Sequence, residues 1–249
     1  MTLTKPLQDL GRYCVFMGKV FSIPEKWKIF FKRTINEISK LGIDSVPLVI
    51  IISVFIGAVI TIQMKLNTSS PLLPAYAVGL TTREIILLEF SSTILCLILA
   101  GKVGSNIASE IGTMRVTEQI DALEIMGVNS ACFLVLPKII GFLLIIPFLC
   151  VLSMGTSILG GLGIAYFTDI ISVSRFTYGL QSSFNEWYVW YSIIKSCVFS
   201  IIITSTASFF GYYVKGGALD VGKSSTRAVV NSSIFILFFD VLLTNLLLQ

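Results

Sequence analysis

The 249-residue sequence contains no histidine, and only 13% of its residues are charged. The absence of histidine excludes the usual histidine zinc sites and histidine acid–base chemistry. The five cysteines do not suggest a disulfide framework, because their number is odd and Cys96, Cys150 and Cys197 lie inside apolar runs. Hydrophobic residues make up 55% of the chain, and the mean hydropathy is +0.88. A soluble domain of this size could not bury so much apolar surface, so the composition predicts a membrane protein.

Five apolar runs are long enough to cross a bilayer as helices, since one crossing needs about 20 mostly apolar residues. We expect spans at about 46–64, 84–103, 134–168, 187–214 and 228–248. The runs are rich in β-branched residues, but a run of this length in lipid satisfies its backbone hydrogen bonds only as a helix. The predicted fold is an all-α membrane protein, with a separate segment over residues 1–45 and a five-span domain over residues 46–249.

Lysine and arginine are distributed unevenly over the segments outside these spans. Fourteen of them precede the first span or fall in the second and fourth connections and at their ends, whereas the other two connections hold only Lys65, Arg83 and Arg175. Basic connections tend to remain in the cytoplasm. The amino terminus is therefore expected in the cytoplasm and the C-terminus on the outer side of the membrane.

The first 45 residues are predicted to form an amphipathic segment rather than a signal peptide, because charges interrupt every apolar stretch. Ser22 and Glu25 are spaced as a capping box, with Pro24 in the first turn. Apolar and aromatic residues then recur at helical spacing from Trp27 to Leu41. We expect a helix that lies in the cytoplasmic membrane interface; a cytosolic helix packed against a partner is the alternative.

A polar, acid-rich helix is predicted between the second and third spans, over residues 113–127. Its apolar residues share one face, and Glu118, Asp121 and Glu124 lie on the flank and back. Acidic residues oppose the anionic cytoplasmic leaflet, so we expect them to meet cations of a partner outside the bilayer. A solvated amphipathic connector is the alternative.

The run from Glu110 to Val128, together with Leu99–Ala108, closely resembles the signature of MlaE-type permeases of ABC transporters. The order of the spans, the basic amphipathic start and the fourth connection fit this family over nearly the whole chain. The resemblance implies that residues 46–249 form the permease domain and that residues 113–127 form a coupling helix, which contacts a separate cytoplasmic ATPase. The coupling residues would be Thr113, Arg115, Glu118, Gln119, Asp121, Glu124 and Met126.

The same resemblance implies a transport subunit rather than an enzyme, with no cofactor in this chain and with ATP and Mg²⁺ bound by the partner ATPase. It implies a homodimer, a periplasmic lipid-binding MCE-domain protein and movement of phospholipids between the inner and outer membranes, which contributes to outer-membrane lipid asymmetry. The expected location is the bacterial inner membrane, with a periplasmic C-terminus; a plastid inner envelope is the second candidate. No nucleic-acid partner is expected.

Three charged residues lie well inside predicted spans rather than near their ends, and a charge that faced lipid there would be costly. Glu89, Lys195 and Asp240 fall at similar depths in the outer half, so Lys195 could bridge the two acids. The resemblance favours a polar cluster that lines or latches a lipid cavity; a buried ion pair that fixes helix register is the alternative. Relatives often have Arg-Glu followed by Gly-Pro where this chain has Leu88–Ser92, so a basic headgroup contact is absent here.

Two other functions are weaker candidates. An ion-coupled secondary carrier would use Glu89, Lys195 and Asp240 as a proton relay, but five spans are an odd number and no inverted repeat is visible. A membrane enzyme has no support, because no nucleophile signature or paired-acid motif is present. The residues Gly217–Ser224 match the Walker A pattern letter for letter, but they follow a span rather than a strand, so nucleotide binding is not expected.

Overall fold

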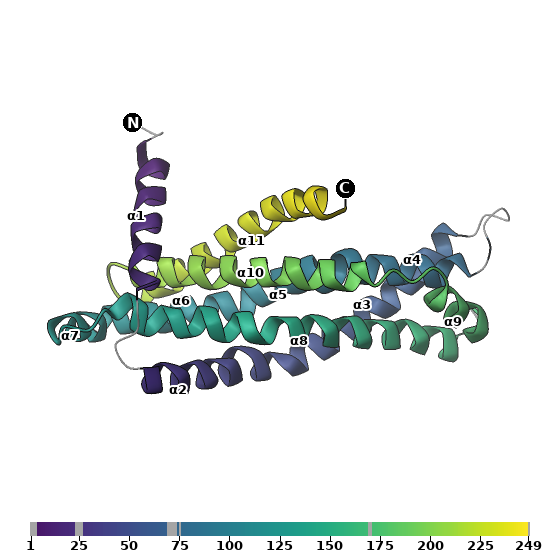
Figure 1. Ribbon diagram of the computed structural model, residues 1–249, viewed down its shortest axis with the longest axis horizontal. Coiled ribbons are helices and arrows are strands. Elements are labelled where there is room, and N and C mark those ends of the chain that lie inside the picture. Colours follow the sequence, from purple (N-terminus) through teal and green to yellow (C-terminus); the bar gives the residue numbers. More distant parts are fainter. Residues whose placement is uncertain (1–3, 23–26, 69–73, 75, 169–170, 249) are drawn as a thin grey trace. The chain divides into compact units, whose positions relative to one another are not determined.

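The computed structural model describes residues 4–22, 27–68, 74, 76–168 and 171–248. Within these residues every regular element is a helix (Figure 1). The stretches long and apolar enough to cross a membrane are Trp27–Asn67, Ala77–Val116, Ser130–Phe167, Trp187–Tyr212 and Ala218–Leu248. The prediction of an all-α membrane protein with five spans is confirmed. The first, second and fifth stretches begin well before the predicted spans, because helix continues into the polar sequence that precedes each apolar run.

The amphipathic segment continues directly into the first span. In chain order the elements are α1 (Thr4–Val20), α2 (Trp27–Glu37), a π-helical turn (Ile38–Gly42), a 3-10 turn (Ile43–Ser45) and α3 (Val46–Asn67). Pro47 occupies the first turn of α3, where its missing N–H leaves no helical hydrogen bond unmade. Pro24 and Glu25 of the predicted capping box lie outside the described residues.

The second stretch alternates between α-helix and π-helix. Its elements are α4 (Ala77–Ile85), a π-helical segment (Ile86–Ile94), α5 (Leu95–Leu99), a second π-helical segment (Ala100–Gly104) and α6 (Ser105–Val116). A π-helical turn holds more residues than an α-helical turn, so it redirects the side chains that follow, and such turns are frequent at functional sites. Glu89 lies in the first of these segments.

The remaining elements include one helix that the sequence did not predict. They are α7 (Gln119–Ile125), α8 (Ser130–Phe167), α9 (Val173–Gln181), α10 (Trp187–Tyr212) and α11 (Ala218–Leu248). The unpredicted helix is α9, in the third connection, which packs closely against α4 because Gly79 and Gly179 face each other without side chains. The Walker-like residues Gly217–Ser224 run into the first turns of α11, so they do not form a phosphate loop between a strand and a helix.

The described chain divides into two compact units. The first unit contains residues 1–43, 97–145 and 198–241, and the second contains residues 44–96, 146–197 and 242–249. Helices α8, α10 and α11 therefore contribute residues to both units.

In the second unit, α3 and α8 approach so closely that their backbones touch. A Cβ added to Gly57 would overlap the carbonyl of Ser157, and one added to Gly160 would overlap the carbonyl of Val54. The hydroxyls of Ser53 and Ser153 also form a 2.9 Å hydrogen bond between the two helices. Small residues and hydroxyl pairs are the usual means by which helices associate in lipid, where burial of apolar side chains gains little.

In the first unit, α1 is anchored by aromatic residues against the end of α10. Phe16 is fully buried, and its ring lies 5.0 Å from that of Tyr212. The Tyr13 hydroxyl donates a 2.8 Å hydrogen bond to Ser205, and burial raises the pKa of Tyr13 above its ordinary value. This packing fixes the position of Arg12, the residue before Tyr13 in α1, relative to the end of α10.

Candidate functional site

Lys195 of α10 is the centre of a polar cluster in the second unit. Its side chain is 0% exposed, and its ammonium donates to the Tyr191 hydroxyl at 2.9 Å and to the Thr244 hydroxyl at 3.3 Å. It also lies 3.5 Å from Oε1 of Glu89, whose side chain is 45% exposed. A buried ammonium stays charged only where such oxygens replace water. The cluster therefore has a buried cation and a carboxylate that is open on one side.

The π-helical segment Ile86–Ile94 presents Glu89 to this cluster. Thr93 donates a 3.2 Å hydrogen bond to Oε2 of Glu89, and the other carboxylate oxygen, Oε1, faces Lys195. The hydroxyl of Ser192, on α10, donates to the carbonyl of Leu87. A wide helical turn disturbs the regular backbone hydrogen bonds, and a hydroxyl from a neighbouring helix can satisfy a carbonyl that is left over.

The sequence predicted two members of this cluster and missed two others. The structure brings Glu89 and Lys195 together, as expected. Asp240 lies half-buried on α11 and belongs to the other compact unit, so its approach to Lys195 stays a prediction. Tyr191 and Thr244 were missed, although helical spacing carries a signal for both. Tyr191 precedes Lys195 by four residues and Thr244 follows Asp240 by four, which places each pair on one helix face.

The segment predicted as one coupling helix over residues 113–127 is two helices with a break between them. Helix α6 ends at Val116, α7 begins at Gln119, and Glu118 adopts a left-handed conformation with φ 61° and ψ 11°. The prediction of a single helix is corrected here. Local hydrogen bonds explain the break: Thr117 donates to the Thr113 carbonyl, and the Gln119 amide donates to the Thr117 hydroxyl at 3.0 Å.

Several of the predicted coupling residues bond within the chain. Arg115 forms a 2.6 Å ion pair with Asp121. The Glu124 carboxylate accepts hydrogen bonds from Tyr212 at 2.7 Å and Ser130 at 2.9 Å. These hydrogen bonds, chiefly that from Tyr212, hold the pKa of Glu124 below its ordinary value. These acids therefore help to hold α7 in place, in addition to any contact with a partner.

The surface that α7 exposes is more apolar than the sequence suggested. Thr113, Glu118 and Gln119 are exposed, as expected for partner-binding residues. At the end of α7, Ile125 is 88% exposed and Met126 is 68% exposed. Ile125 was not predicted as a contact residue; the helical wheel could not identify it because the break at Glu118 changes the face that α7 presents. We call Ile125 and Met126 the apolar tip.

A second buried lysine joins the coupling segment to the amphipathic segment in the first unit. Lys138 of α8 is 2% exposed, and its ammonium lies 2.8 Å from Glu37 of α2 and 2.9 Å from Glu110 of α6. Lys40 reaches the same oxygen of Glu110 at 2.7 Å. We call Glu37, Lys40, Glu110 and Lys138 the base network. The sequence did not predict it, because Lys138 stands at the end of an apolar run and resembles an ordinary basic anchor.

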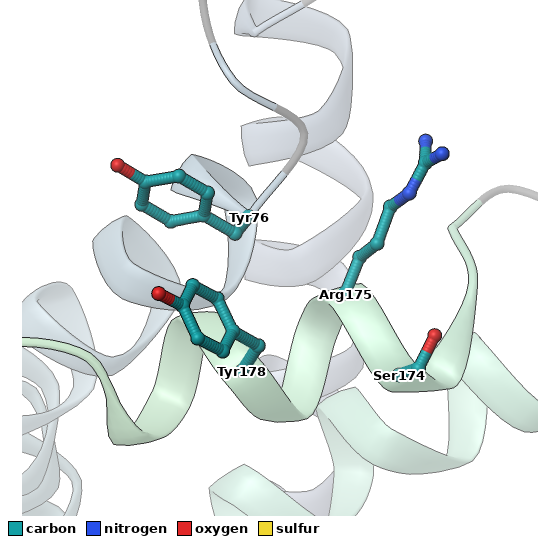
Figure 2. A pocket seen from close by; sticks show the side chains of 4 residues that line it. All are labelled: Tyr76, Ser174, Arg175 and Tyr178. Atoms are coloured by element: carbon teal, nitrogen blue, oxygen red, sulfur yellow. The ribbon is translucent and has the colours of Figure 1, made fainter.

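In the second unit, a shallow pocket of about 560 Å³ lies where α9 meets the start of α4. Tyr76, Ser174, Arg175 and Tyr178 line it, and the two tyrosine rings meet edge to face at 5.4 Å (Figure 2). Arg175 extends away from the tyrosine pair (Figure 2). The pocket is open, and Arg175 is the charged residue among its described lining, so it is a surface feature of the third connection rather than an enclosed site.

Arg83 is almost completely buried, with 2% of its side chain exposed. From the sequence it was counted only as a basic residue of the first connection. Its guanidinium donates to the carbonyls of Leu180 and Ser182, each at 2.7 Å, and to that of Ser183 at 3.2 Å. Arg83 therefore holds the end of α9 against α4. Across the part of the chain that the structure describes, no group of three or more Cys, Asp or Glu side chains is arranged to hold a metal ion.

Five membrane-length helices, a buried cation beside a half-open carboxylate and a short exposed helix between two spans are the features of a membrane permease subunit. The comparison with known proteins agrees. The family model described as "Permease MlaE" matches residues 34–246. The chain belongs to the MlaE permease family.

Curated relatives cover nearly the whole chain. A probable ABC transporter permease protein of Rickettsia bellii is 31% identical over 244 residues, which cover 96% of this chain and 92% of the relative. A probable ABC transporter permease protein of Synechocystis is 33% identical over 237 residues, which cover 93% and 88%. The protein TRIGALACTOSYLDIACYLGLYCEROL 1, chloroplastic, of Arabidopsis thaliana is 28% identical over 240 residues, which cover 94% and 67%. The chain is thus a transport subunit without catalytic activity of its own, and its class implies an ATPase partner.

Proposed function

We propose that this permease moves phospholipids between the inner and outer membranes of a bacterial envelope and so contributes to outer-membrane lipid asymmetry. The observation that carries the proposal is the pairing of buried Lys195 with half-exposed Glu89 inside a span. A phospholipid headgroup offers a phosphate for the ammonium and, in phosphatidylethanolamine, an amine for the carboxylate. One relative is named after a glycolipid, which agrees with a lipid substrate.

The proposed transporter contains two copies of this chain, two ATPase subunits and a periplasmic MCE-domain protein. Only 11% of the most apolar stretch of α11 is buried within the chain, so most of this helix is left for lipid or a second copy to cover. We propose that spans one, two and five of the two copies frame a lipid cavity that opens toward the outer face. The amino terminus and α7 lie in the cytoplasm in this arrangement, as the basic connections favour.

In the proposed transport cycle, the ATPase binds the coupling segment, residues 113–127, and moves it. The apolar tip enters a hydrophobic groove of the ATPase, and the exposed Glu118 meets a cation at the rim. Because the base network ties α6 to α2 and α8, a push on α6 is transmitted to the helix that continues into the first span. The spans then squeeze the cavity and drive the bound lipid toward the MCE-domain protein.

Transport by the reconstituted complex tests this function. The complete transporter would be placed in proteoliposomes with labelled phosphatidylethanolamine, and ATP-dependent transfer to acceptor vesicles would be measured. Lys195→Ala and Glu89→Gln should each lower the transfer rate by roughly tenfold or more, since a charged hydrogen bond to the headgroup is lost. Lys28→Ala, at an exposed position on α2, is the matched control and should transfer lipid at the wild-type rate.

The alternative, an ion-coupled carrier, predicts a different result. This alternative is supported by the same observation, because a buried lysine beside a carboxylate inside a span is also an arrangement that can relay protons. Copurification of a stoichiometric ATPase together with ATP-dependent transfer supports the proposed function. Transport driven by an ion gradient without ATP, or unchanged lipid transfer by both cluster variants, would reject it.

A further inference from the structure

A basic pocket lies in the first unit, where α1, the end of α10 and the start of α11 meet. The pocket has a volume of about 500 Å³. Its cations come from three parts of the chain, namely Arg12 of α1, Lys215 of the fourth connection, and Lys223 and Arg227 of α11. None of these residues belongs to the polar cluster around Lys195 or to the base network.

Among the residues that the structure describes, cations outnumber acids in the lining of this pocket. Asp220 is the acidic residue among the described lining residues; it lies 3.4 Å from Lys223 and also accepts a 3.3 Å hydrogen bond from the backbone N–H of Gly217. In the described lining, one carboxylate therefore accompanies four cations. Cations that converge from separate elements repel one another, so an anion that binds among them gains energy from several contacts at once.

The walls of the pocket and its surroundings are apolar. Phe209 and Tyr213 of the α10 end form one wall, with rings 5.1 Å apart. On two of the helices that line the pocket, Leu10 and Val15 of α1 and Leu219 of α11 are exposed. Because α10 and α11 are spans, this combination of cations and exposed apolar residues lies at the boundary between the membrane and water. It is a surface suited to a ligand with a charged head and an apolar tail.

We propose that this pocket binds the phosphate of an anionic phospholipid of the surrounding bilayer, as a site separate from the transported lipid. The arginines can bind phosphate oxygens bidentately, while the lysines act as point charges on it. The aromatic wall and the exposed apolar residues of α1 contact the glycerol and acyl chains. Such a lipid joins α1 to α10 and α11 from outside, so it stabilises α1 in its docked position.

Native mass spectrometry of the full-length protein in detergent tests the site. The protein would be titrated with phosphatidylglycerol and, separately, with phosphatidylcholine. The wild type should retain phosphatidylglycerol in preference, and the Lys223→Gln/Arg227→Gln double variant should bind it roughly tenfold or more weakly, with no change for phosphatidylcholine. The matched control, Lys28→Gln/Lys32→Gln, removes the same charge from exposed positions of α2 outside the pocket and should bind like the wild type.

Further measurements in the same experiment distinguish a lipid from other anions. Lys223→Arg/Arg227→Lys keeps the charge and should retain the preference; its loss would contradict a charge-based phosphate site. Inorganic phosphate at the concentration of the lipid should not displace phosphatidylglycerol; displacement would show a site for a soluble anion and overturn the lipid assignment. The double variant should still copurify with the ATPase. Loss of the ATPase with unchanged phosphatidylglycerol binding would identify the pocket as a protein contact and reject the proposal, whereas the proposed transport function would stand.

Discussion

Lys138 and Lys195 are both buried lysines, but the contacts that the structure shows for their ammonium groups differ in kind. Lys138 has two carboxylates within 3 Å, those of Glu37 and Glu110. Lys195 lies 2.9 Å from the Tyr191 hydroxyl, 3.3 Å from the Thr244 hydroxyl and 3.5 Å from the Glu89 carboxylate. The first arrangement is neutralised by the chain itself and has a structural character. The second places a buried cation beside a half-exposed carboxylate, and such a site can accept a zwitterionic headgroup.

Removal of Lys138 should therefore destabilise the protein. In Lys138→Ala, Glu37 and Glu110 remain close together without the buried cation between them, and the expected loss is about 3 kcal/mol of unfolding free energy. Thermal unfolding of the purified protein in detergent would show it as a lower midpoint. The control is Lys40→Ala, because Lys40 bonds the same oxygen of Glu110 from a position with 44% side-chain exposure and should cost at most about 1 kcal/mol. Equal losses for the two variants would contradict the central place of Lys138.

Glu124 should give the first unit a pH-dependent contribution to stability. Hydrogen bonds from Tyr212 and Ser130 lower its folded pKa, so the carboxylate stabilises the fold at pH above the unfolded value of about 4.3. The contribution is lost as pH falls through the folded pKa. The difference in unfolding midpoint between the wild type and Glu124→Gln should therefore be largest near neutral pH and shrink in acid. A difference that is constant from pH 7 to pH 3 would contradict this account.

At the scale of elements, α3 and α8 can approach only where glycines remove side chains. Gly160→Ala should lower the unfolding free energy by about 1–3 kcal/mol, because its Cβ would overlap the Val54 carbonyl. Gly155, on the same helix, has no atom near its Cβ position, so Gly155→Ala is the matched control and should be neutral or slightly stabilising. Chemical or thermal unfolding in detergent measures both. Similar effects for the two variants would show that the contact with α3 does not matter.

The apolar tip should carry the contact with the ATPase. Met126→Asp and Ile125→Asp should leave the fold intact, because both side chains are exposed, and weaken ATPase association by roughly tenfold or more, as truncation of a buried interface anchor would. Copurification and a binding titration with the ATPase measure the effect. Leu219→Asp, at an equally exposed apolar position of another connection, should bind the ATPase like the wild type. Retention of the ATPase by both tip variants would place its contact elsewhere.

Hydropathy predicted the five spans because the length and polarity of a segment determine whether it can cross lipid. The same signal says nothing about helical register, so the π-helical segments were missed. One carbonyl there, that of Leu87, is bonded by Ser192, a residue far away in the sequence. The pairing of Glu89 with Lys195 was predictable because charges in lipid must find partners. The break at Glu118 and the burial of Lys138 and Arg83 could not be predicted from the sequence, since each depends on contacts that only the folded chain supplies.

At the scale of the whole molecule, the proposed topology can be read from the accessibility of single thiols. In a Cys14→Ser background, where the exposed native thiol is removed, a cysteine at Glu118 should react only with reagents that reach the cytoplasm. A cysteine at Arg175, in the third connection, should react with membrane-impermeant reagents added from the outer side. Both positions are exposed, so access depends on the side of the membrane rather than on burial. Reaction of both from one side would invalidate the assigned orientation.

Helix α7 is bonded to three different spans. Asp121 pairs with Arg115, which belongs to the second span, and Glu124 bonds Ser130 of the third and Tyr212 of the fourth. A displacement of α7 therefore acts on all three spans at the same time, rather than passing from one span to the next. Loss of one of these bonds should weaken the movement of one span, while the other two spans still move with α7. Graded defects, in place of all-or-none loss, are the expected signature of substitutions along these links.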